Sequence, residues 1–453
     1  MINYFLKILT KKLGLNQAIL FSIGLRGWQT LAGLVTLFLI AHFFTPIQQG
    51  FFYTFNSLLM LQIFFEMGFS YVLIQFNSHE FAHLKWARLG RVSGGKKIQR
   101  FKVLLAKSLH WYFWSAILFI IITVPIGLYF LGLKSTNLGF YWRSPWVFLV
   151  LMTGINLLLM PFLSCIEGSG QVREVYRLRF FQNVCGTCVA WLVILLHGGL
   201  YNAVALSTAT ALISFFWLFK NRPGLLRIAT DKKIKKLFSA DLLCWKTEIW
   251  PMQWRIAISW ISGYFINQIF VPILFYYKNP IVAGQMGMSL AISTMLVFVG
   301  QAWISAKAPM LGKIVAKGDW AELDSTFYRL VKQSSAIVLL SCFGFISVVM
   351  VFQYFPIAHR LLPPFQLCFL VGSAFISHFI NCIAQYLRSH KQEPFMILSV
   401  IGAILIANSA WFFGKYYSSE GIVIAVFLIN LVYGLPSAIW LWRKKRKLWH
   451  HLL

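Results

Sequence analysis

Apolar runs long enough to cross a membrane recur along the whole chain, separated by shorter polar or basic stretches. A spanning helix needs about 20 mostly apolar residues. We predict six such helices in the first half of the chain, at residues 18–43, 51–76, 109–133, 145–167, 180–198 and 203–219. Six more are predicted at residues 252–276, 281–304, 334–355, 364–387, 395–415 and 421–442. The predicted fold class is an all-α polytopic membrane protein with about twelve transmembrane helices.

A weak internal repeat divides these helices into two sets of six. The first helix of each set carries an arginine followed four residues later by a hydroxyl residue, at Arg26 and at Arg255. The turn into the next helix reads Pro46-Ile47-x-x-Gly50 in one set and Pro280-Ile281-x-x-Gly284 in the other. Many transporters are built from two related bundles around a site near the bilayer midplane. We therefore predict two six-helix bundles around a central cavity. The first bundle comprises residues 1–219, and the second comprises residues 248–453 and ends in a basic cytoplasmic tail. Residues 220–247 form a basic cytoplasmic linker between them.

The positive charge of the chain is explained by where its Lys and Arg residues lie. With 59% hydrophobic and 12% charged residues, the chain is too apolar for a soluble domain of this size. If the N-terminus is cytoplasmic, 34 of the 41 Lys and Arg residues fall in cytoplasmic segments and five in outer loops. This asymmetry satisfies the positive-inside rule and predicts that both termini are cytoplasmic. The basic segments are expected to contact anionic membrane lipids, and no nucleic-acid partner is predicted.

Two charged residues, Arg26 and Glu66, lie inside the first two predicted helices. A charge at the centre of a bilayer costs about 2.5–3.5 kcal/mol on insertion scales, so such residues usually face a cavity or a partner. Gln29 and Thr30 lie one helical turn from Arg26, and Gln62 lies one turn before Glu66, which gives this helical hairpin a polar side. We interpret that side as the wall of a substrate cavity. The alternative for Arg26 is snorkelling toward the headgroups.

Arg255 places a second guanidinium in the corresponding helix of the second set. A guanidinium offers a planar fork of donors and keeps its charge, which suits a phosphate or pyrophosphate group. Arg26 and Arg255 are therefore predicted to bind the headgroup of an anionic lipid substrate. Glu66 is predicted to hold an arginine in the empty state, or to bind a proton or sodium ion for coupling. The alternative for all three residues is a static ion pair between helices.

Polar residues on later helices provide further candidate contacts. Residues 373, 377, 381 and 385 of the tenth predicted helix are all polar and follow one another at four-residue steps. A polar stripe of that length must face protein or water. Asn381 of this stripe, Gln285 of the eighth helix and Gln62 of the second are predicted to contact the substrate. His378 beside the stripe is a candidate coupling residue, although a hydrogen-bonded interior histidine is the favoured interpretation.

Sequence signatures of an enzyme are absent. The chain has no phosphate-binding glycine and lysine loop and no zinc-spaced histidine pair, and its acidic residues are scattered. The predicted outer loops are short, about four to thirteen residues, which leaves no room for an outer catalytic domain. We therefore expect no enzymatic activity, no cofactor and no metal site.

Three stretches near the N-terminus carry a family resemblance. They are Gln49-Gly50-Phe51-Phe52-Tyr53-Thr54-Phe55, Phe64-Phe65-Glu66-Met67-Gly68-Phe69 and Gln75-Phe76-x-Ser78-His79-Glu80. Together they resemble the N-terminal hairpin of bacterial polysaccharide-biosynthesis flippases, the O-antigen and capsule repeat-unit transporters of the multidrug/oligosaccharidyl-lipid/polysaccharide exporter superfamily. The predicted helix count, inner termini and short outer loops extend the resemblance to the whole chain at the level of architecture.

The resemblance implies a two-lobed transporter of the bacterial inner membrane. Such a protein moves undecaprenyl-pyrophosphate-linked oligosaccharide from the cytoplasmic to the outer leaflet by alternating access, and polysaccharide-assembly proteins are expected partners. Cavity arginines in that family are thought to receive the pyrophosphate, and Arg26 and Arg255 are the positions here that could match. Two alternatives stay open: a cation-coupled multidrug exporter of the same superfamily, and a membrane-embedded acyl- or glycosyltransferase that uses His378 or Glu66.

Overall fold

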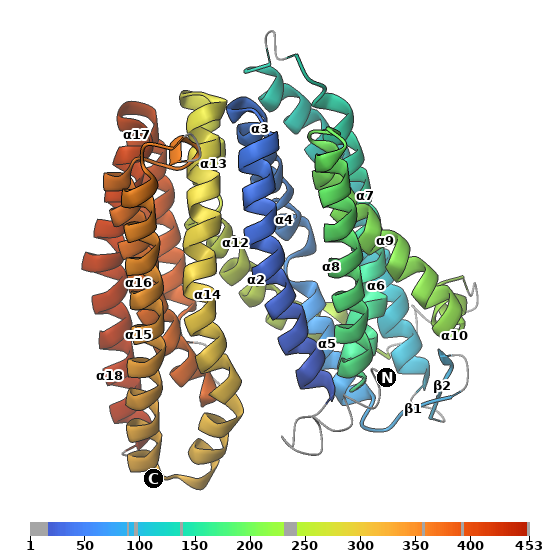
Figure 1. Cartoon of the computed structure of the whole chain (residues 1–453). Coiled ribbons are helices and arrows are strands. Elements are labelled where there is room, and N and C mark those ends of the chain that lie inside the picture. The colour runs from blue at the N-terminus through green and yellow to red at the C-terminus, as the bar shows by residue number, and fades with distance from the viewer. Residues whose placement is uncertain are drawn as a thin grey trace, which may run out of the picture. The chain divides into compact units, whose positions relative to one another are not determined.

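The structure of the protein is a computed structural model that describes residues 17–87, 90–94, 98–135, 139–230, 242–355, 358–390 and 394–450. Almost all of these residues are helical (Figure 1). Residues 231–241 of the predicted linker lie outside the described residues.

The helices up to residue 230 are α2 (Gln17–Phe43), α3 (Pro46–Leu59), α4 (Gln62–Glu66), α5 (Phe69–Glu80), α6 (Ile98–Gly132), α7 (Arg143–Gly168), α8 (Val172–Leu195), α9 (Tyr201–Asn221) and α10 (Pro223–Thr230). Between α5 and α6, an antiparallel hairpin is formed by strands β1 (Lys85–Trp86) and β2 (Val92–Ser93). The later segments are the π-helical turn η4 (Trp245–Ile249), α12 (Trp250–Asn267), α13 (Phe270–Tyr277), α14 (Pro280–Lys317), α15 (Trp320–Phe352), the 3₁₀ turn η5 (Ala358–Arg360), α16 (Pro364–Ser389), α17 (Met396–Ile429), the π-helical turn η6 (Asn430–Gly434) and α18 (Leu435–His450).

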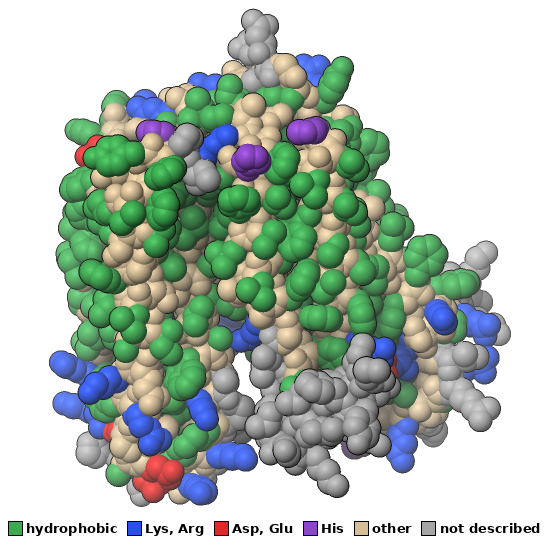
Figure 2. Space-filling view, viewed as in Figure 1, with side chains coloured by type: hydrophobic (Ala, Val, Ile, Leu, Met, Phe, Trp, Pro, Cys, Tyr) green, Lys and Arg blue, Asp and Glu red, His purple; other side chains and the backbone are tan. Residues whose placement is uncertain are grey.

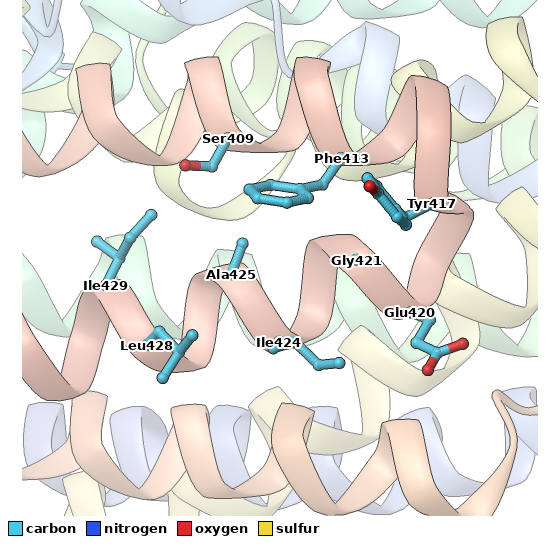
Figure 3. A pocket seen from close by; sticks show the side chains of 9 residues that line it. All are labelled: Ser409, Phe413, Tyr417, Glu420, Gly421, Ile424, Ala425, Leu428 and Ile429. Carbon is cyan, nitrogen blue, oxygen red and sulfur yellow. The ribbon is translucent and has the colours of Figure 1, made fainter.

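Nine of the described helices are long and apolar enough to span a membrane, and two bent pairs each add one span. One pair joins α3 and α4 to α5 with a bend of 45°, and the other joins η4 and α12 to α13 with a bend of 47°. Helix α17 folds back at Ser418, whose φ is 61°, so its two arms count as separate spans (Figure 3). Counted in this way, the described residues contain the twelve predicted spans. The protein is an all-α polytopic membrane protein, as predicted.

Residues 305–333, which lie between two of the predicted helices, are almost entirely helical. Helix α14 continues until Gly318, whose φ of 72° ends the helix. The side chain of Asp319 then accepts a hydrogen bond from the Glu322 N–H at 2.9 Å and starts α15. An N-terminal cap of this kind satisfies one of the free N–H groups at a helix start. Hydrophobic length therefore underestimated these helices, because capping residues and not the apolar run set their ends.

Contacts group the chain into two compact units. The first unit consists of Met1–Phe44 and Leu58–Trp260, and the second of Thr45–Ser57 and Ile261–Leu453. Two of the unit boundaries fall inside α3 and α12, which belong to the two bent spans. The bundle boundaries proposed from the sequence, at residues 219 and 248, remain predictions.

In the first unit, α8 packs against α2 and α9, and α7 packs against α5, α6 and α9. A cluster of buried apolar side chains joins α6, α7 and α9 to α10 and the β1–β2 hairpin. Trp86 of the hairpin donates its indole N–H to the Ser169 hydroxyl at 3.0 Å, and the Arg222 guanidinium lies 4.6 Å from the centre of its ring. The hairpin is thus held against the ends of the helices.

In the second unit, α14 packs against α15 and α16, and α16 packs against α17 and α18 (Figure 1). The core contains Phe327, Tyr386 and Trp442, one each from α15, α16 and α18. Asp324 of α15 accepts hydrogen bonds from the Tyr386 hydroxyl at 2.9 Å and from the guanidinium of Arg446 on α18. Figure 2 shows Lys and Arg side chains gathered at this end of α14, α15 and α18.

Residues 45–57, which include most of α3, pack closely against α14 within the second unit. A Cβ added to Gly50 would lie 1.9 Å from the Pro280 carbonyl oxygen, and one added to Gly284 would lie 2.8 Å from the Gly50 nitrogen. Gln49 donates its side-chain amide N–H to the Gly284 carbonyl oxygen at 3.0 Å. The two Pro-Ile-x-x-Gly motifs of the proposed repeat therefore meet backbone to backbone, and any side chain at Gly50 would force them apart.

Large apolar side chains are exposed along the middle of the helices (Figure 2). Leu31 is 65% exposed on α2, Ile121 is 63% exposed on α6, and Phe343 is 73% exposed on α15. Soluble monomers rarely leave so many large apolar residues in contact with water. This surface fits a protein whose helices face lipid.

Candidate functional site

The second span is interrupted where α4 ends at Glu66 and α5 begins at Phe69. The two residues between them, Met67 (φ 53°) and Gly68 (φ 64°), adopt left-handed backbone conformations. Such a conformation costs roughly 1–2 kcal/mol for a residue with a side chain, so methionine is strained here. The single helix predicted over residues 51–76 is therefore broken here, because the left-handed pair ends the helical hydrogen bonding.

The carboxyl group of Glu66 is buried at this break, and only 4% of the residue is exposed. Its Oε1 atom accepts hydrogen bonds from the Tyr112 hydroxyl of α6 at 3.2 Å and from the backbone N–H of Ser70 at 3.3 Å. Both donors are neutral. Among the described residues, no Lys, Arg or His forms an ion pair with Glu66. The structure thus places Glu66 inside the protein without the arginine partner that its sequence context suggested.

Aromatic rings surround the start of α5. The ring of Phe69 lies 5.7 Å from that of Tyr112 and 4.9 Å from that of Trp245 on η4, measured between ring centres. Trp111 stacks on Trp245 at 5.5 Å. Three segments that are distant in the sequence, α5, α6 and η4, therefore meet at the helix break and form an apolar wall beside the Glu66 carboxyl group.

Gln253 of α12 lies on the helix face that meets the break. Residues 253, 256 and 260 share one face of a helix. A Cβ added to Gly68 would lie 2.5 Å from the Ile256 side chain and 3.4 Å from that of Trp260. Gln253 is 0% exposed, and neither its amide nitrogen nor its amide oxygen has a hydrogen-bond partner among the described residues. Sequence analysis missed Gln253. A glutamine inside an apolar run was the available signal, but the sequence does not show which helix packs against it.

Arg26 lies exposed on α2, which packs against α8. The hydroxyl of Thr30 donates to the Arg26 carbonyl oxygen at 3.0 Å, within the same helix. Gln29, expected to share a polar cavity wall with Arg26, instead donates its amide N–H to the Asn183 side chain of α8 at 3.3 Å. Gln29 therefore serves the packing of α2 against α8.

Arg255 lies exposed on α12, and its guanidinium carbon is 5.6 Å from the ring centre of Trp254. Arg26 and Arg255 both belong to the first contact unit. Other arginines of that unit pair with carboxylates: Arg100 lies 2.7 Å from Glu80, and Arg179 lies 2.8 Å from Glu167. Within the described residues, Arg255 has no such acidic partner.

His378 is completely buried between α14, α15 and α16. Its Nε2 atom lies 3.1 Å from the Ser334 hydroxyl and 3.5 Å from the Cys382 sulfur. Its Nδ1 atom lies 3.3 Å from the side-chain amide nitrogen of Gln301. A Cβ added to Gly300 would lie 3.0 Å from the ring, so the helices approach one another closely here. The geometry agrees with the favoured interpretation of a hydrogen-bonded interior histidine.

The remaining predicted residues have different surroundings. Gln62 is the first residue of α4 and lies half-buried, one turn before Glu66. Gln285 donates its amide N–H to the His359 carbonyl oxygen of η5 at 2.9 Å, so it ties α14 to that loop. Asn381 is exposed on α16. Ser373, which belongs to the same predicted polar stripe, accepts a hydrogen bond from the Asn430 side-chain amide at 2.7 Å.

Outside these positions, the described residues contain a pocket between the two arms of α17 but no metal-binding cluster. The pocket has a volume of about 490 Å³. Figure 3 shows the rings of Phe413 and Tyr417 pointing from one arm toward the other, with Ala425 opposite and Glu420 beside the turn. The lining is mostly apolar, and none of the residues predicted to bind substrate belongs to it.

No protein-family model matches the chain, and no curated protein matches it. Solved structures do match over almost the whole chain. One is an inward-facing multidrug resistance MATE family transporter of the MOP superfamily, at 13% identity and a TM-score of 0.59, covering 93% of this chain and 98% of that chain. The lipid II flippase MurJ in an inward closed conformation matches at 12% identity and a TM-score of 0.60, covering 93% of this chain and 87% of that chain.

A eukaryotic MATE transporter also matches, at 11% identity and a TM-score of 0.58, covering 96% of this chain and 99% of that chain. The chain therefore has the fold of MATE and MurJ transporters. At identities of 11–13%, the likeness concerns the fold and leaves substrate and site residues to be argued from this chain.

Proposed function

We propose that the protein is a flippase that moves undecaprenyl-pyrophosphate-linked oligosaccharide repeat units from the cytoplasmic to the outer leaflet of a bacterial inner membrane. The fold it shares with a lipid II flippase supports transport of a lipid-linked substrate. The N-terminal sequence resemblance supports a polysaccharide repeat unit as that substrate. In this proposal the protein works by alternating access and is not an enzyme.

Arg255 is the observation that carries the proposal. An exposed arginine in an apolar helix is costly unless it faces a partner or a water-filled space. Arg255 is exposed on α12 and has no carboxylate partner among the described residues. A pyrophosphate would supply the missing negative charge and accept two parallel N–H donors from the guanidinium. Arg26 is proposed as the second pyrophosphate contact.

The other predicted residues take supporting roles. Gln62 and Asn381 are proposed to contact sugar hydroxyl groups, and Gln285 to do so through its amide oxygen, because its nitrogen is donated to His359. Glu66 is proposed as the coupling residue, with a proton or sodium ion as the coupling cation. His378 is the other candidate coupling residue, but we favour a structural role for it, because its ring nitrogens already lie within hydrogen-bonding distance of neighbouring side chains.

The cellular arrangement follows the charge distribution. We propose that both termini are cytoplasmic, and that the basic segments contact anionic lipids and polysaccharide-assembly proteins. The proposed bundles remain residues 1–219 and 248–453, with residues 220–247 as the cytoplasmic linker.

Complementation tests the proposal. A bacterial strain that lacks its polysaccharide flippase would receive the wild type, Arg26→Ala, Arg255→Ala or the corresponding Lys variants, at matched membrane levels. We expect alanine to abolish surface polysaccharide and lysine to restore part of it, since lysine keeps the charge but loses the planar fork. Arg143→Ala is the matched control, because Arg143 is exposed and lies 5.5 Å from the ring centre of its neighbour Trp142, much as Arg255 lies beside Trp254.

The main alternative is a cation-coupled multidrug exporter. The buried Glu66 carboxyl group without a cationic partner favours this alternative, since it could attract a cationic drug. If all arginine variants support polysaccharide export like the wild type, the headgroup site is wrong. Drug accumulation that rises on deletion of the protein, and falls again with wild type but not with Glu66→Gln, would then identify an exporter.

A further inference from the structure

The pocket between the two arms of α17, residues 396–417 and 419–429, is a site that the proposed function does not use. It has a volume of about 490 Å³, and its lining residues belong to α17. Figure 3 shows Ser409 and Ile429 at one end of the pocket and Tyr417 and Glu420 at the other, beside the turn. Ligand pockets in proteins have volumes of about 300–1,000 Å³. The space between the arms is therefore large enough for an alkyl chain.

Small residues keep this pocket open. Gly421 and Ala425 line it on the second arm, and Ser409 lines it on the first. A Cβ added to Gly421 would lie 2.6 Å from the Tyr417 Cβ and 3.0 Å from the Phe413 Cβ, so a side chain there would collide with the other arm. The pocket exists because these positions carry small side chains, and larger ones would fill it.

The pocket runs along the arms, from the turn toward the middle of the membrane. Ser409 and Tyr417 are separated by about 12 Å along a helix. The hydrocarbon layer of one leaflet is about 15 Å deep, which is half of the bilayer core. Tyr417 and Leu428 line the pocket and are exposed, so an alkyl chain can enter it from the surrounding lipid. Water is disfavoured between Phe413, Ile424 and Leu428, because these apolar side chains offer it no hydrogen bonds.

The end of the pocket at the turn carries charge. Glu420 is exposed there and forms no ion pair with any Lys, Arg or His in the part of the chain that the structure describes. Lys415, just before the turn, is exposed, and its Nζ atom lies 5.0 Å from the ring centre of Tyr416 and 6.0 Å from that of Trp411. Trp, Tyr and Lys side chains gather at the level of lipid headgroups. The turn therefore presents a negative and a positive group at headgroup depth.

We propose that the pocket binds one acyl chain of phosphatidylethanolamine, with the ammonium group of the lipid at Glu420. A primary ammonium group donates charge-assisted hydrogen bonds to a carboxylate, whereas the quaternary ammonium group of phosphatidylcholine has no N–H to donate. Lys415 supplies a positive charge for the lipid phosphate. Phosphatidylglycerol, or the pyrophosphate of the proposed substrate, would place a negative charge beside Glu420 without a compensating ammonium group. This lipid site is independent of the proposed flippase function, because no residue proposed to contact the substrate lines the pocket.

Photolabelling locates the lipid. Full-length protein in phosphatidylcholine nanodiscs would contain a small fraction of phosphatidylethanolamine with a diazirine near the end of one acyl chain, and mass spectrometry would identify the labelled peptides. We expect labelling concentrated on α17 in the wild type. Ser409→Leu fills the pocket and should reduce this labelling to the level of other lipid-facing helices. Ser341→Leu is the matched control, because Ser341 is also half-buried and its neighbours Leu340 and Phe343 on α15 are exposed.

Competition measures the headgroup preference. Unlabelled phosphatidylethanolamine, phosphatidylcholine and phosphatidylglycerol with identical acyl chains would each compete with the photolabel. We expect phosphatidylethanolamine to compete roughly threefold to tenfold better than the other two, as charge-assisted hydrogen bonds at an exposed carboxylate allow. Glu420→Gln should remove that preference. Glu322→Gln is the matched control, because Glu322 is an exposed acid of α15 that does not line the pocket.

Thermal unfolding in the same nanodiscs shows whether each variant is folded. If Ser409→Leu unfolds, Ala425→Leu fills the pocket from the other arm and takes its place.

Three results would overturn the inference. The first is labelling spread evenly over the lipid-facing helices, or labelling of α17 that the pocket-filling variant leaves unchanged. The second is equal competition by the three phospholipids, or a preference that survives Glu420→Gln. The third is stronger competition by undecaprenyl phosphate, which would assign the pocket to the chain of a substrate lipid. Labelling involves no transport, so the lipid site can fail while Arg255→Ala abolishes export, and it can persist while all arginine variants export normally.

Discussion

The two buried candidate coupling groups, Glu66 and His378, have opposite surroundings. His378 is 0% exposed, and both ring nitrogens lie within hydrogen-bonding distance of side chains from neighbouring helices. The helices around it are uninterrupted. Glu66 is 4% exposed, lies where its helix is broken, and forms no ion pair with a Lys, Arg or His among the described residues. A complete hydrogen-bond network holds helices together, whereas an incomplete one at a helix break leaves chemistry for a ligand to complete.

The largest expected difference between the two centres is in transport. Glu66→Gln should reduce export by about a hundredfold, because typical coupling free energies correspond to 5–150-fold changes. His378→Gln should keep most of the export, since glutamine can still donate to and accept from Ser334 and Gln301. Export in the complemented strain, at matched membrane levels, measures both. Equal losses in the two variants would contradict the contrast between the centres.

For stability, we expect the larger loss at His378 and the smaller one at Glu66. His378→Leu leaves the buried Ser334 hydroxyl and the Gln301 amide without their partner and should destabilise the protein by about 2 kcal/mol. Glu66→Gln keeps a group that can accept the Tyr112 hydrogen bond and should cost less than about 1 kcal/mol. Thermal unfolding of the purified variants in one detergent provides the comparison. A less stable Glu66→Gln protein would show that Glu66 also holds the fold together.

The helix break itself can be tested at Gly68. Gly68→Ala places a side chain at a φ of 64° and 2.5 Å from Ile256, so we expect a loss of about 1–2 kcal/mol and reduced export. Gly263→Ala is the control, because a Cβ there meets no atom within 4 Å and alanine favours the helix. Thermal unfolding and export assays on both variants separate strain at the break from a general effect of removing glycine.

The smallest expected effect is at single hydrogen bonds. Tyr112→Phe removes one donor to Glu66, and Ser334→Ala removes one contact to His378, each costing about 0.5–1.5 kcal/mol. Tyr112→Phe should also alter cation affinity, whereas Ser334→Ala should not. Combining Tyr112→Phe with Glu66→Gln in a double-mutant cycle measures their coupling. Additive effects of the two substitutions would mean that the tyrosine acts independently of Glu66.

The fold was predictable because lipid imposes a simple rule on the sequence. Each span must be apolar over about 20 residues, and that rule located all twelve spans. It could not locate the break at Met67–Gly68, since apolarity continues through Phe64, Phe65 and Phe69 and only local backbone geometry ends the helix. Nor could it show that residues 305–333 extend two helices, because helical caps and not hydrophobicity set those ends.

The candidate site was predictable only residue by residue. Charged and polar residues inside apolar runs pointed to Glu66, His378 and Arg255, and all three lie within described helices. Which of them meet is a tertiary property. The contact of Glu66 with Tyr112 and the approach of α12 to Gly68 join positions 46 residues or more apart in the chain, and no helical spacing encodes such pairs. Gln253 was missed for the same reason.

Direct translocation in proteoliposomes tests the central claim, that the protein moves a lipid through recognition of its pyrophosphate. Purified wild type, Arg255→Ala and Arg143→Ala would be reconstituted with a fluorescent oligosaccharide on undecaprenyl pyrophosphate, or with the same oligosaccharide on the uncharged lipid alcohol. We predict leaflet exchange of the pyrophosphate-linked lipid only, with wild type and Arg143→Ala active and Arg255→Ala inactive. Equal exchange of both lipids, or equal activity of the wild type and Arg255→Ala, would contradict the account.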